Sequence, residues 1–588
     1  MEYKLGKWSL ADLYPDDYKA SFNHDLEKLT ALVNAFENVR GELNDAIPGE
    51  RFAEIMKDYD AIVSLEYKLF GFCSLRFEAD TQDSSALSLM GQTDAVITEL
   101  GNRVLFFDLW WTKLADEPAA RLIAACPENA YFLSAMRLSK PYTLNESEEK
   151  IINIKNSTGA SALDNIYSSI TNRYVFKLTV DGEEKSLTRE GIMVYARSDK
   201  PELRKAAYEE LYRVYGDDGN ILGQIYQNIC RAWDQENLGI RGYKSPIAAR
   251  NLGNDIPDDV VDLLLETCRK NKDVFINYFK LKKELLGLDE FHRRDLYAPM
   301  KTDTTKISFD EAFKTMLASY NNFDPEFAKM AERVYNEHHI DSEPRHGKRG
   351  GAFCETLGPN YTPWVLLNFQ GRAEDTSTIA HELGHAIHSM SAEDKTIFQQ
   401  SSCLPLAETA STFGEMLLAD YMQSTVTDKA VLRDMLIKQL DDNYATIQRQ
   451  AYFALFEKEA HRMIGEGADI DELNAAYLAN LNEQFGDAVV VDDYFKWEWV
   501  SIPHIFATPF YVYAYAFGQL LVLALYAQYK KEGKTFIPRY KEMLHKGGSQ
   551  RPQDLLLDAG FDFTKEAFWQ GGFDILKEKV EKLREITR

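Results

Sequence analysis

Helical periodicity runs through most of this 588-residue chain and limits what it can fold into. Apolar residues recur three and four positions apart, with good helix formers between them, in residues 22–39, 55–72, 203–215 and 431–455. Each such helix must bury its apolar face against another element, so we expect a mainly α fold. The length is about four times that of a typical domain, which fits two or more lobes and also one large helical body with a deep cleft.

Strand signals are few, and the clearest of them is a hairpin. Residues 174–180 are followed by Asp181-Gly182 and by a polar arm through residues 186–188, and the turn between them needs a positive φ at Gly182. We expect this hairpin near the end of an N-terminal helical lobe over residues 1–195. Residues 196–588 then form a second domain.

The charge balance excludes one class of partner. The chain has 67 Lys and Arg against 92 Asp and Glu, which gives a formal net charge of −25. Because polyanions bind through basic residues that displace counterions, we expect no nucleic-acid partner, and an anionic membrane surface is disfavoured for the same reason.

The six cysteines are scattered singly, and the first eight residues lack the apolar run of a signal peptide. We therefore expect reduced thiols and a cytoplasmic protein.

One stretch is apolar enough to suggest a membrane helix. Residues 499–529 contain no Asp, Glu, Lys or Arg, but their first half holds Ser501, Pro503, His504 and three tyrosines. These polar groups are costly in lipid and suit the wall of an internal cleft, so we expect no membrane span.

The segment from Pro344 to Met416 differs in composition from the rest of the chain. A Gly-rich basic loop runs from Arg345 to Gly351, and its spacing fits neither a P-loop nor a dinucleotide fingerprint. Residues 364–369 then form a short apolar run bounded by Pro363 and Gly371, which predicts a strand. Two helices follow, and they carry the chemistry.

The first of these helices contains an H-E-x-x-H motif, His381-Glu382-Leu383-Gly384-His385. On a helix, His381 and His385 lie one turn apart on one face, so both imidazoles can bind a single zinc ion while Glu382 projects beside them. Helix formation is supported by N-cap candidates at Asp375, Thr376 and Ser377 and by an apolar stripe of Ile379, Leu383, Ile387 and Met390.

A zinc hydrolase needs a third protein ligand. The extended metzincin motif fails here, because Ser391 replaces its third histidine and His388 replaces its glycine. We expect His388 to support the site without binding the metal. Pro405 opens the next helix, on which Glu408 and Glu415 share a polar face. We expect Glu408 to be the third ligand, because it lies nearer the turn, and Glu415 to orient a ligating histidine.

Several separated runs of this sequence resemble one known family. The runs are Trp8 to Tyr14, Lys348 to Cys354, His381 to His385 with Glu408, Pro503 to Phe506, and Pro509 to Ala516. In this order they are similar to the oligoendopeptidase F branch of the thimet oligopeptidase family, and they span nearly the whole chain.

The resemblance implies a mainly α fold in which two helical lobes enclose a deep channel, with a small β-sheet beside the H-E-x-x-H helix as in thermolysin-like zincin catalytic cores. It implies one Zn²⁺ per chain and makes residues 196–588 the zinc peptidase catalytic domain. The implied activity is hydrolysis of internal bonds in short unstructured peptides. In this mechanism Glu382 activates a zinc-bound water and passes its proton to the leaving amine.

Further catalytic residues are implied downstream. The oxyanion of the reaction needs a donor besides zinc, and members of the family use a His and a Tyr from the region that here holds His504, Tyr511 and Tyr515. The two tyrosines are four residues apart on a helix that we expect Pro509 to begin, so they share one face. Tyr513 falls on another face, where we expect it to pack.

Two substrate-binding elements are expected near the zinc helix. An edge strand containing Val365, Leu366, Leu367 and Asn368 is expected to pair with an extended peptide. The loop at Gly350 and Gly351 is expected to close over that peptide. Since the chain is strongly acidic, we also expect cationic peptides to be attracted more than anionic ones, with added salt weakening the bias.

Other functions stay open at this point. A carboxypeptidase or dipeptidyl carboxypeptidase of similar architecture needs a cation for the substrate carboxylate, which Arg345, Lys348 or Arg349 could supply. A non-catalytic zinc-binding or peptide-binding protein is a second alternative, and a membrane-associated protein using residues 499–529 is a third. The oligomeric state is open.

Overall fold

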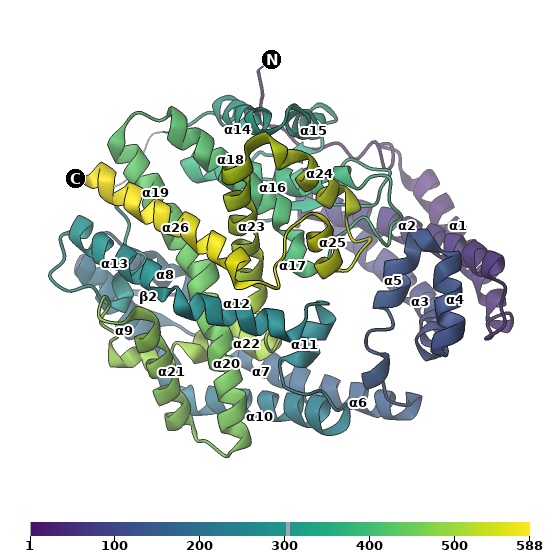
Figure 1. Cartoon of the computed structure of the whole chain (residues 1–588), viewed down its shortest axis with the longest axis horizontal. Helices are drawn as coiled ribbons and strands as arrows, with labels where there is room; N and C mark the ends of the chain where they lie inside the picture. Colours follow the sequence, from purple (N-terminus) through teal and green to yellow (C-terminus); the bar gives the residue numbers. More distant parts are fainter. Residues whose placement is uncertain (1, 301–305) are drawn as a thin grey trace. The chain divides into compact units, whose positions relative to one another are not determined.

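Helices make up most of the structure, a computed structural model that describes residues 2–300 and 306–588 (Figure 1). Local sequence signals set many of the helix ends. At the start of α14 (Phe309–Phe323), the Ser308 side chain accepts a hydrogen bond from the backbone N–H of Glu311. The carboxylate of Glu311 in turn accepts one from the backbone N–H of Ser308. This reciprocal capping satisfies two donors that a bare helix start leaves unpaired. The prediction of a mainly α fold is confirmed.

The chain divides into two compact units, each assembled from three stretches of sequence. Unit 1 comprises Met1–Lys140, Thr304–Thr425 and Gln528–Asp562, and unit 2 comprises Pro141–Asp303, Val426–Ala527 and Phe563–Arg588. The predicted boundary between residues 195 and 196 lies inside unit 2. A single cut cannot separate these units, because each packs together segments that are distant in the sequence. The division at residue 195 into an N-terminal lobe and a catalytic domain stays a prediction.

Unit 1 contains long helices in its first segment and a small sheet among helices in its second. Its elements are α1 (Lys19–Glu37), η1 (Asn38–Gly41), α2 (Gly49–Ala79), α3 (Ser84–Lys113), α4 (Asp116–Ala125), η2 (Pro127–Asn129), α5 (Ala130–Ala135), α14, α15 (Pro325–Asn336), β3 (Ile340–Asp341), β4 (Phe353–Glu355), β5 (Trp364–Leu366), α16 (Ala373–Ser391), α17 (Leu404–Ala407), α18 (Thr409–Thr425), η9 (Gly533–Thr535), α24 (Ile537–Lys546) and α25 (Pro552–Asp558).

The described residues of unit 2 form helices and one hairpin. Its elements are α6 (Glu146–Thr158), α7 (Ala160–Thr171), β1 (Phe176–Val180), β2 (Glu183–Leu187), α8 (Arg189–Ala196), α9 (Pro201–Asp217), α10 (Gly219–Asp234), η4 (Gln235–Ile240), α11 (Ala248–Gly253), α12 (Asp258–Lys270), α13 (Lys272–Leu286), η5 (Arg293–Asp295), α19 (Lys429–Asn443), η6 (Tyr444–Gln448), α20 (Arg449–Gly465), α21 (Ile470–Phe485), η7 (Asp493–Trp497), η8 (Trp499–Ser501), α22 (Pro503–Ala507) and α26 (Glu566–Thr587). Two of the limits between the units fall within elements, one in η3 (Lys140–Tyr142) and one in α23 (Tyr513–Glu532).

The predicted hairpin is confirmed. β1 pairs antiparallel with β2, and Val180 lies opposite Glu183. Both turn residues have positive φ, 50° at Asp181 and 86° at Gly182. Such a two-residue turn matches the right-handed twist of the strands that it joins.

A three-stranded sheet in unit 1 precedes the helix that carries the H-E-x-x-H motif. Its strand order is β3, β5, β4, with β5 parallel to β3 and antiparallel to β4. β5 is fully buried, in agreement with its apolar sequence. The prediction that residues 365–369 form an edge strand is wrong, because β5 is the central strand of this sheet. β3 and β4 are the two outer strands, and the outer edge of β4 pairs with no other strand among the described residues.

The H-E-x-x-H helix, α16, packs closely against α18 (Figure 1). Glycines permit this approach. A Cβ atom on Gly384 would lie 2.5 Å from the Cα atom of Ser411, and one on Gly414 would lie 2.3 Å from the hydroxyl oxygen of Tyr320. That hydroxyl donates to the carbonyl of Ala380 on α16. The two helices are thereby held close enough for side chains of short reach to meet.

The predicted apolar stripe of α16 is confirmed, since Ile379, Leu383, Ile387 and Met390 are all buried. The helix begins earlier than the predicted N-cap residues, with Arg372 at its N-cap. Asp375 lies in the first turn, where its carboxylate accepts from the backbone N–H groups of Gln370 and Arg372. Its negative charge is favourable at a helix N-terminus.

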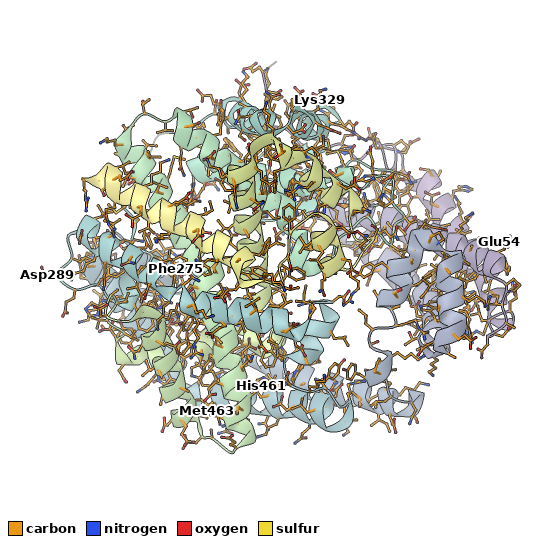
Figure 2. All side chains as sticks on the ribbon, viewed as in Figure 1. Glu54, Phe275, Asp289, Lys329, His461 and Met463 are labelled. Atoms are coloured by element: carbon orange, nitrogen blue, oxygen red, sulfur yellow. The ribbon has the colours of Figure 1, made fainter. Side chains whose placement is uncertain are left out.

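Unit 2 has its own aromatic core. Figure 2 labels Phe275 on α13 and His461 on α20, and Phe275 is buried against Tyr444 with ring centroids 5.7 Å apart. Phe517, in the apolar half of residues 499–529, packs against Trp569 at 5.1 Å. The apolar stretch thus contributes to the protein interior. Among the described residues, no helix combines the length and the apolar character needed to cross a bilayer.

The cysteines agree with the prediction of reduced, mostly buried thiols. The structure describes all six and joins none of them in a disulfide, and Cys73, Cys126, Cys230 and Cys268 are buried. Burial raises the pKa of Cys126 to about 11. A thiol with so high a pKa holds little thiolate at neutral pH and is therefore unreactive.

Candidate metal centre

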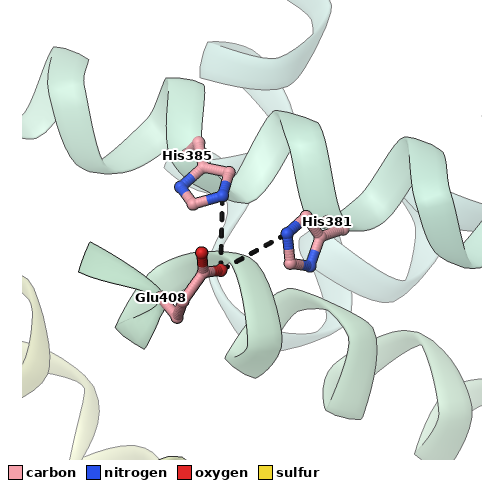
Figure 3. A group of neighbouring side chains, drawn as sticks. All are labelled: His381, His385 and Glu408. Carbon is pink, nitrogen blue, oxygen red and sulfur yellow. Dashed lines mark ion pairs between the residues drawn. The ribbon is translucent and has the colours of Figure 1, made fainter. Parts of the chain in front are cut away.

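Three donor side chains converge between α16 and the start of α18 (Figure 3). The Oε2 atom of Glu408 lies 3.3 Å from Nε2 of His381 and 3.4 Å from Nε2 of His385. Glu408 ends α17 with φ −84° and ψ 3°, and α18 begins at the next residue. The predicted unbroken helix over residues 406–416 is therefore wrong. The break places Glu408 opposite the two histidines.

Two hydrogen bonds orient these donors. The Nδ1–H of His381 donates to Oε1 of Glu415 at 2.7 Å, so that Nε2 of the same ring is the nitrogen that faces Glu408. The hydroxyl of Ser411 donates to Oε2 of Glu408, also at 2.7 Å. The structure thus brings Glu415 to a histidine of the motif, where the sequence predicts it. A histidine held through its second nitrogen in this way is typical of metal ligands.

The cluster attracts positive charge. Burial acts to lower the pKa of His381, but the hydrogen bond to Glu415 and the charges of Glu415, Glu382 and Glu408 raise it to about 9. Burial acts to raise the pKa of Glu408, but its pairing with His385 and the charge of His381 lower it to about 2. Three carboxylates face two histidines here, and this excess of acidic groups favours the binding of a cation.

A cavity of about 370 Å³ opens over the three donors, lined by residues of β4, α16 and the segment before α18. Glu382 lines it and is 6% exposed, and burial raises the pKa of its carboxyl group. His388 also lines the cavity but is not one of the three converging donors. Burial lowers the pKa of His388 to about 4, so its imidazole is neutral at pH 7.

The donor set fits zinc. Zinc is bound by histidine nitrogen and carboxylate oxygen at roughly 2.0–2.2 Å, and in a tetrahedron such ligand atoms lie about 3.3 Å apart. The two measured separations from Glu408, 3.3 Å and 3.4 Å, agree with this value. Two imidazoles and one carboxylate also leave the fourth position that a catalytic zinc requires.

The strand that was expected to bind substrate is already paired. Val365 and Leu366 pair with β3 on one side and with β4 on the other. The Leu367 N–H donates to the carbonyl of Asp341 at 2.8 Å. This backbone cannot accept a peptide strand, so the predicted pairing with substrate at residues 365–367 is wrong. β4 both ends the sheet and lines the cavity.

Asn368 supports the Gly-rich loop. Its Nδ2 donates to the carbonyls of Arg349 and Gly351, at 2.9 Å each. Gly351 has a φ of +82°, which favours glycine at this position. Asn368 thus ties down the segment that contains Gly350 and leads into β4. The closing movement of this loop stays a prediction.

The cations considered for a carboxypeptidase are engaged within unit 1. Arg345 binds both carboxylate oxygens of Asp341, at 2.6 and 2.7 Å, and the Nζ of Lys348 lies 2.7 Å from one of them. The side chains of Lys348 and Asp341 are completely buried. Arg349 pairs with Glu78 at 2.5 Å. These contacts brace the sheet and leave Arg345 and Lys348 no reach toward a substrate carboxylate.

The downstream aromatic residues meet in unit 2. The ring centroids of His504 and Tyr511 are 6.2 Å apart, those of His504 and Tyr515 are 6.0 Å apart, and those of the two tyrosines are 5.2 Å apart. Pro509 does not begin a helix, because α23 starts at Tyr513. Tyr511 therefore lies in the turn before α23 and not on its face, yet its ring still contacts the other two. Burial and nearby arginines lower the pKa of His504, so its ring is neutral at pH 7.

Tyr513 is buried, as predicted for a packing residue, and its hydroxyl accepts from Nδ2 of Asn254 at 2.9 Å.

Two residues distant in sequence hold the turn that carries Tyr511. The backbone N–H of Phe510 donates to Oε1 of Glu457 at 2.8 Å, and Arg250 donates to the carbonyl of Pro509 at 3.1 Å. Phe510 has a φ of +58°, which a residue with a side chain adopts only when its surroundings impose it. No motif marks Glu457 or Arg250, because they reach this turn only through the tertiary fold.

Replacing Glu457 by Gln is expected to flatten the dependence of stability on pH. Burial raises the pKa of Glu457 to about 8, well above its usual 4.5. The folded state therefore binds a proton that the unfolded state has lost between these values, and the free energy of unfolding falls as pH rises from about 4.5 to 8, by at most ~1.4 kcal/mol per pH unit. Glutamine keeps an oxygen acceptor for Phe510 and does not titrate.

The measurement is the melting temperature of both proteins between pH 5 and pH 8.5. The variant is expected to gain stability relative to the parent as pH rises, and a constant difference across this interval would contradict the assignment. Glu459→Gln is the control, since this residue lies on the same helix and pairs at the surface with Arg462.

Comparison with known proteins agrees with the site. A model of peptidase family M3 matches residues 194–575. Oligopeptidase PepF of Bacillus subtilis is 27% identical over 590 aligned residues, covering 98% of this chain and 87% of its own. The chromosomal oligoendopeptidase F of Lactococcus lactis subsp. cremoris is 26% identical over 593 residues, covering 99% and 97%.

Solved structures share the fold. A protein from Chlamydophila abortus superposes with a TM-score of 0.91 at 24% identity, covering 99% of this chain and 98% of its own. Oligoendopeptidase-F from Enterococcus faecium superposes with a TM-score of 0.70 at 21% identity, covering 97% and 99%.

The residues matched by the family model include both clusters described above. They contain the three converging donors His381, His385 and Glu408 as well as His504, Tyr511 and Tyr515. The match covers more than half of the chain, and curated relatives extend it over nearly all of it. The resemblance predicted from the sequence is confirmed, and the chain belongs to peptidase family M3.

Proposed function

We propose that the protein is a zinc-dependent oligoendopeptidase that hydrolyses internal bonds of short unstructured peptides. Membership in family M3 makes it a metallopeptidase, and its curated relatives are named oligopeptidase and oligoendopeptidase F. The observation that carries the proposal is the convergence of His381, His385 and Glu408 in a cavity that Glu382 also lines.

His381, His385 and Glu408 would hold one zinc ion per chain. Bound zinc supplies Lewis acidity, which polarises the scissile carbonyl and makes water a better proton donor. Glu382 accepts the proton of the attacking water and returns it to the nitrogen of the leaving amine. Its burial suits this task, because a carboxyl group whose pKa is raised toward neutrality can both accept and release a proton. His388 supports α16 beside the ligands as a neutral ring.

Substrate backbone pairs with β4 in this proposal. β4 ends the sheet, and Phe353 and Cys354 line the cavity that contains Glu382. An extended peptide added to this edge lies alongside α16 with its carbonyls in a fixed register. The loop at Gly350 and Gly351 leads directly into β4 and moves with the arrival of a peptide.

His504, Tyr511 and Tyr515 supply hydrogen-bond donors to the carbonyl oxygen on which negative charge develops. Their contact with one another in unit 2 supports a shared role. A neutral His504 donates through one nitrogen, and each tyrosine donates through its hydroxyl.

Replacing Tyr515 by Phe is expected to lower kcat by about 10²-fold with little change in KM, because the lost donor acts on charge that develops in the transition state. Steady-state kinetics on a quenched fluorescent peptide measures this effect. Tyr513→Phe is the matched control, since it removes a buried hydroxyl from the same helix that contacts Asn254. Equal kcat values for Tyr515→Phe and the parent would remove Tyr515 from the mechanism.

Cleavage of a set of peptides, mapped by mass spectrometry, tests the function. An oligoendopeptidase cuts internal bonds of peptides whose C-terminus is amidated, whereas a carboxypeptidase or dipeptidyl carboxypeptidase stops when the terminal carboxylate is blocked. Internal cuts in both the free and the amidated peptides are expected. The six cysteines are scattered singly along the sequence, which supports a reducing compartment, and we place the enzyme in the cytoplasm.

A further inference from the structure

A cavity beside His504 collects positive charge. Its volume is about 220 Å³, and all the residues that line it belong to unit 2. Four arginines face one carboxylate, the residues being Arg189, Arg197, Arg293, Arg449 and Glu498. We call it the arginine cavity. The local charge of this cavity is positive, whereas the net charge of the whole chain is −25.

Glu498 accepts hydrogen bonds from only some of the arginine N–H groups in the arginine cavity. Its Oε1 accepts from Arg293 at 2.6 Å and from Arg449 at 3.0 Å. Arg293 is 1% exposed, and within the described structure its Nε and Nη1 have no hydrogen-bond partner, nor has Nε of Arg449. The second oxygen of Glu498 is also unpaired, but it leaves the excess of three positive charges unchanged. Buried guanidinium donors without acceptors are costly, so the cavity favours an added anion.

The rest of the lining suits an anion attached to an organic group. Tyr208, Leu211 and Tyr212 on α9 supply an apolar and aromatic wall. Arg189 begins α8 and Arg197 follows its last residue, and both are exposed at the surface. A volume of about 220 Å³ admits a carboxylate with the atoms of about one residue. The planar guanidinium groups match the two oxygens of a carboxylate.

We propose that the arginine cavity binds a carboxylate of the peptide substrate, either the C-terminal carboxylate or an Asp or Glu side chain. The inference rests on the proposed function, because His504 both lines this cavity and is assigned a contact with substrate. The positive charges of Arg189 and Arg449 act on His504, so the field of the cavity reaches that residue. The cavity is thereby a determinant of which peptides are selected.

The arginine cavity and the net charge of the chain act over different distances. The field of the 25 excess negative charges is screened beyond about 8 Å at physiological ionic strength. A carboxylate inside the cavity instead makes direct contacts that salt weakens little. The acidic surface therefore governs approach, and the arginines govern the bound state. Selection of a carboxylate is expected to persist at high salt.

Binding of four matched peptides tests the inference. They are a peptide with a free C-terminus, its C-terminal amide, the amide with one internal Glu, and the same peptide with Gln at that position. Fluorescence anisotropy gives their Kd values on the Glu382→Gln variant loaded with zinc, at low and high salt. The Glu382→Gln variant, with all its arginines in place, is expected to bind at least one of the peptides that carry a carboxylate about tenfold more tightly than the matching neutral peptide. Amidation and the Glu-to-Gln change identify which carboxylate is bound.

Arg189→Gln combined with Arg197→Gln is expected to reduce that preference to less than about threefold. Both side chains are exposed, so the fold is retained, which circular dichroism verifies. Arg213→Gln on α9 is the control, because it removes the same charge from a surface pair with Glu210 and is expected to keep the full preference. Equal Kd values for both peptide pairs, or a preference that survives the double substitution, would overturn the inference. Failure of the proposed function would give a different result, because the protein without substitutions would then bind these peptides and cleave none of them.

Discussion

Replacing Glu382 by Gln is expected to lower kcat by about 10²–10⁴-fold while the protein keeps its zinc. Glutamine preserves the shape and the burial of the side chain at 6% exposure but can neither accept nor return a proton. The metal-binding atoms belong to other residues, so the bound metal is untouched. The measurements are peptide cleavage and zinc content by atomic emission on the same sample.

Glu374→Gln is the matched control for this change, since Glu374 lies exposed in the first turn of the same helix. It is expected to cleave peptides at the parental rate. Retention of substantial activity by Glu382→Gln would assign the proton transfer to another group, and loss of zinc from it would make the carboxylate a metal ligand.

The sequence alone predicted those parts of the site that depend on local periodicity. His381 and His385 are one helical turn apart, and a helix requires that they share a face. The motif leaves the residue before His385 unspecified, and only the fold explains why it is glycine, because a Cβ at Gly384 would meet the backbone of α18 at Ser411. The hairpin at Asp181-Gly182 was predictable for the same local reason, since its turn type demands positive φ.

Long-range pairing explains what the sequence did not predict. The apolar run at β5 indicates a strand but not its neighbours, and a two-residue partner such as β3 leaves no signal of its own. The central position of β5 in the sheet could therefore not be predicted from the sequence. Glu408 was predicted as a ligand because it lies near the turn between the two helices, yet the helix break that directs it toward α16 depends on packing between α16 and α18. Glu457 and the arginine cavity are assembled from distant segments and carry no motif.

Substitution of Glu408 by Ala is expected to abolish tight zinc binding and, with it, peptide cleavage. Its Oε2 is the atom on which both imidazoles converge, at 3.3 and 3.4 Å, so its loss removes one of three ligand atoms. Glu415→Gln is expected to be milder, with zinc affinity lowered about 10- to 100-fold, because an amide oxygen still accepts from Nδ1 of His381 while the charge is lost. Competition with a chromophoric chelator measures zinc affinity directly, without reference to activity.

The relative sizes of these two losses of zinc affinity distinguish a metal ligand from a residue that orients a ligand. Glu408→Ala must weaken zinc binding by more than the ~100-fold limit for an indirect partner, and Glu415→Gln must stay within it. Glu393→Ala provides the control in unit 1, because its carboxylate pairs with Arg333 at the surface and is absent from the cluster. A Glu408→Ala protein with parental zinc affinity would move the third ligand elsewhere. If Glu415→Gln lost more zinc than Glu408→Ala, the two glutamates would exchange roles, and the interruption between α17 and α18 would lose its functional explanation.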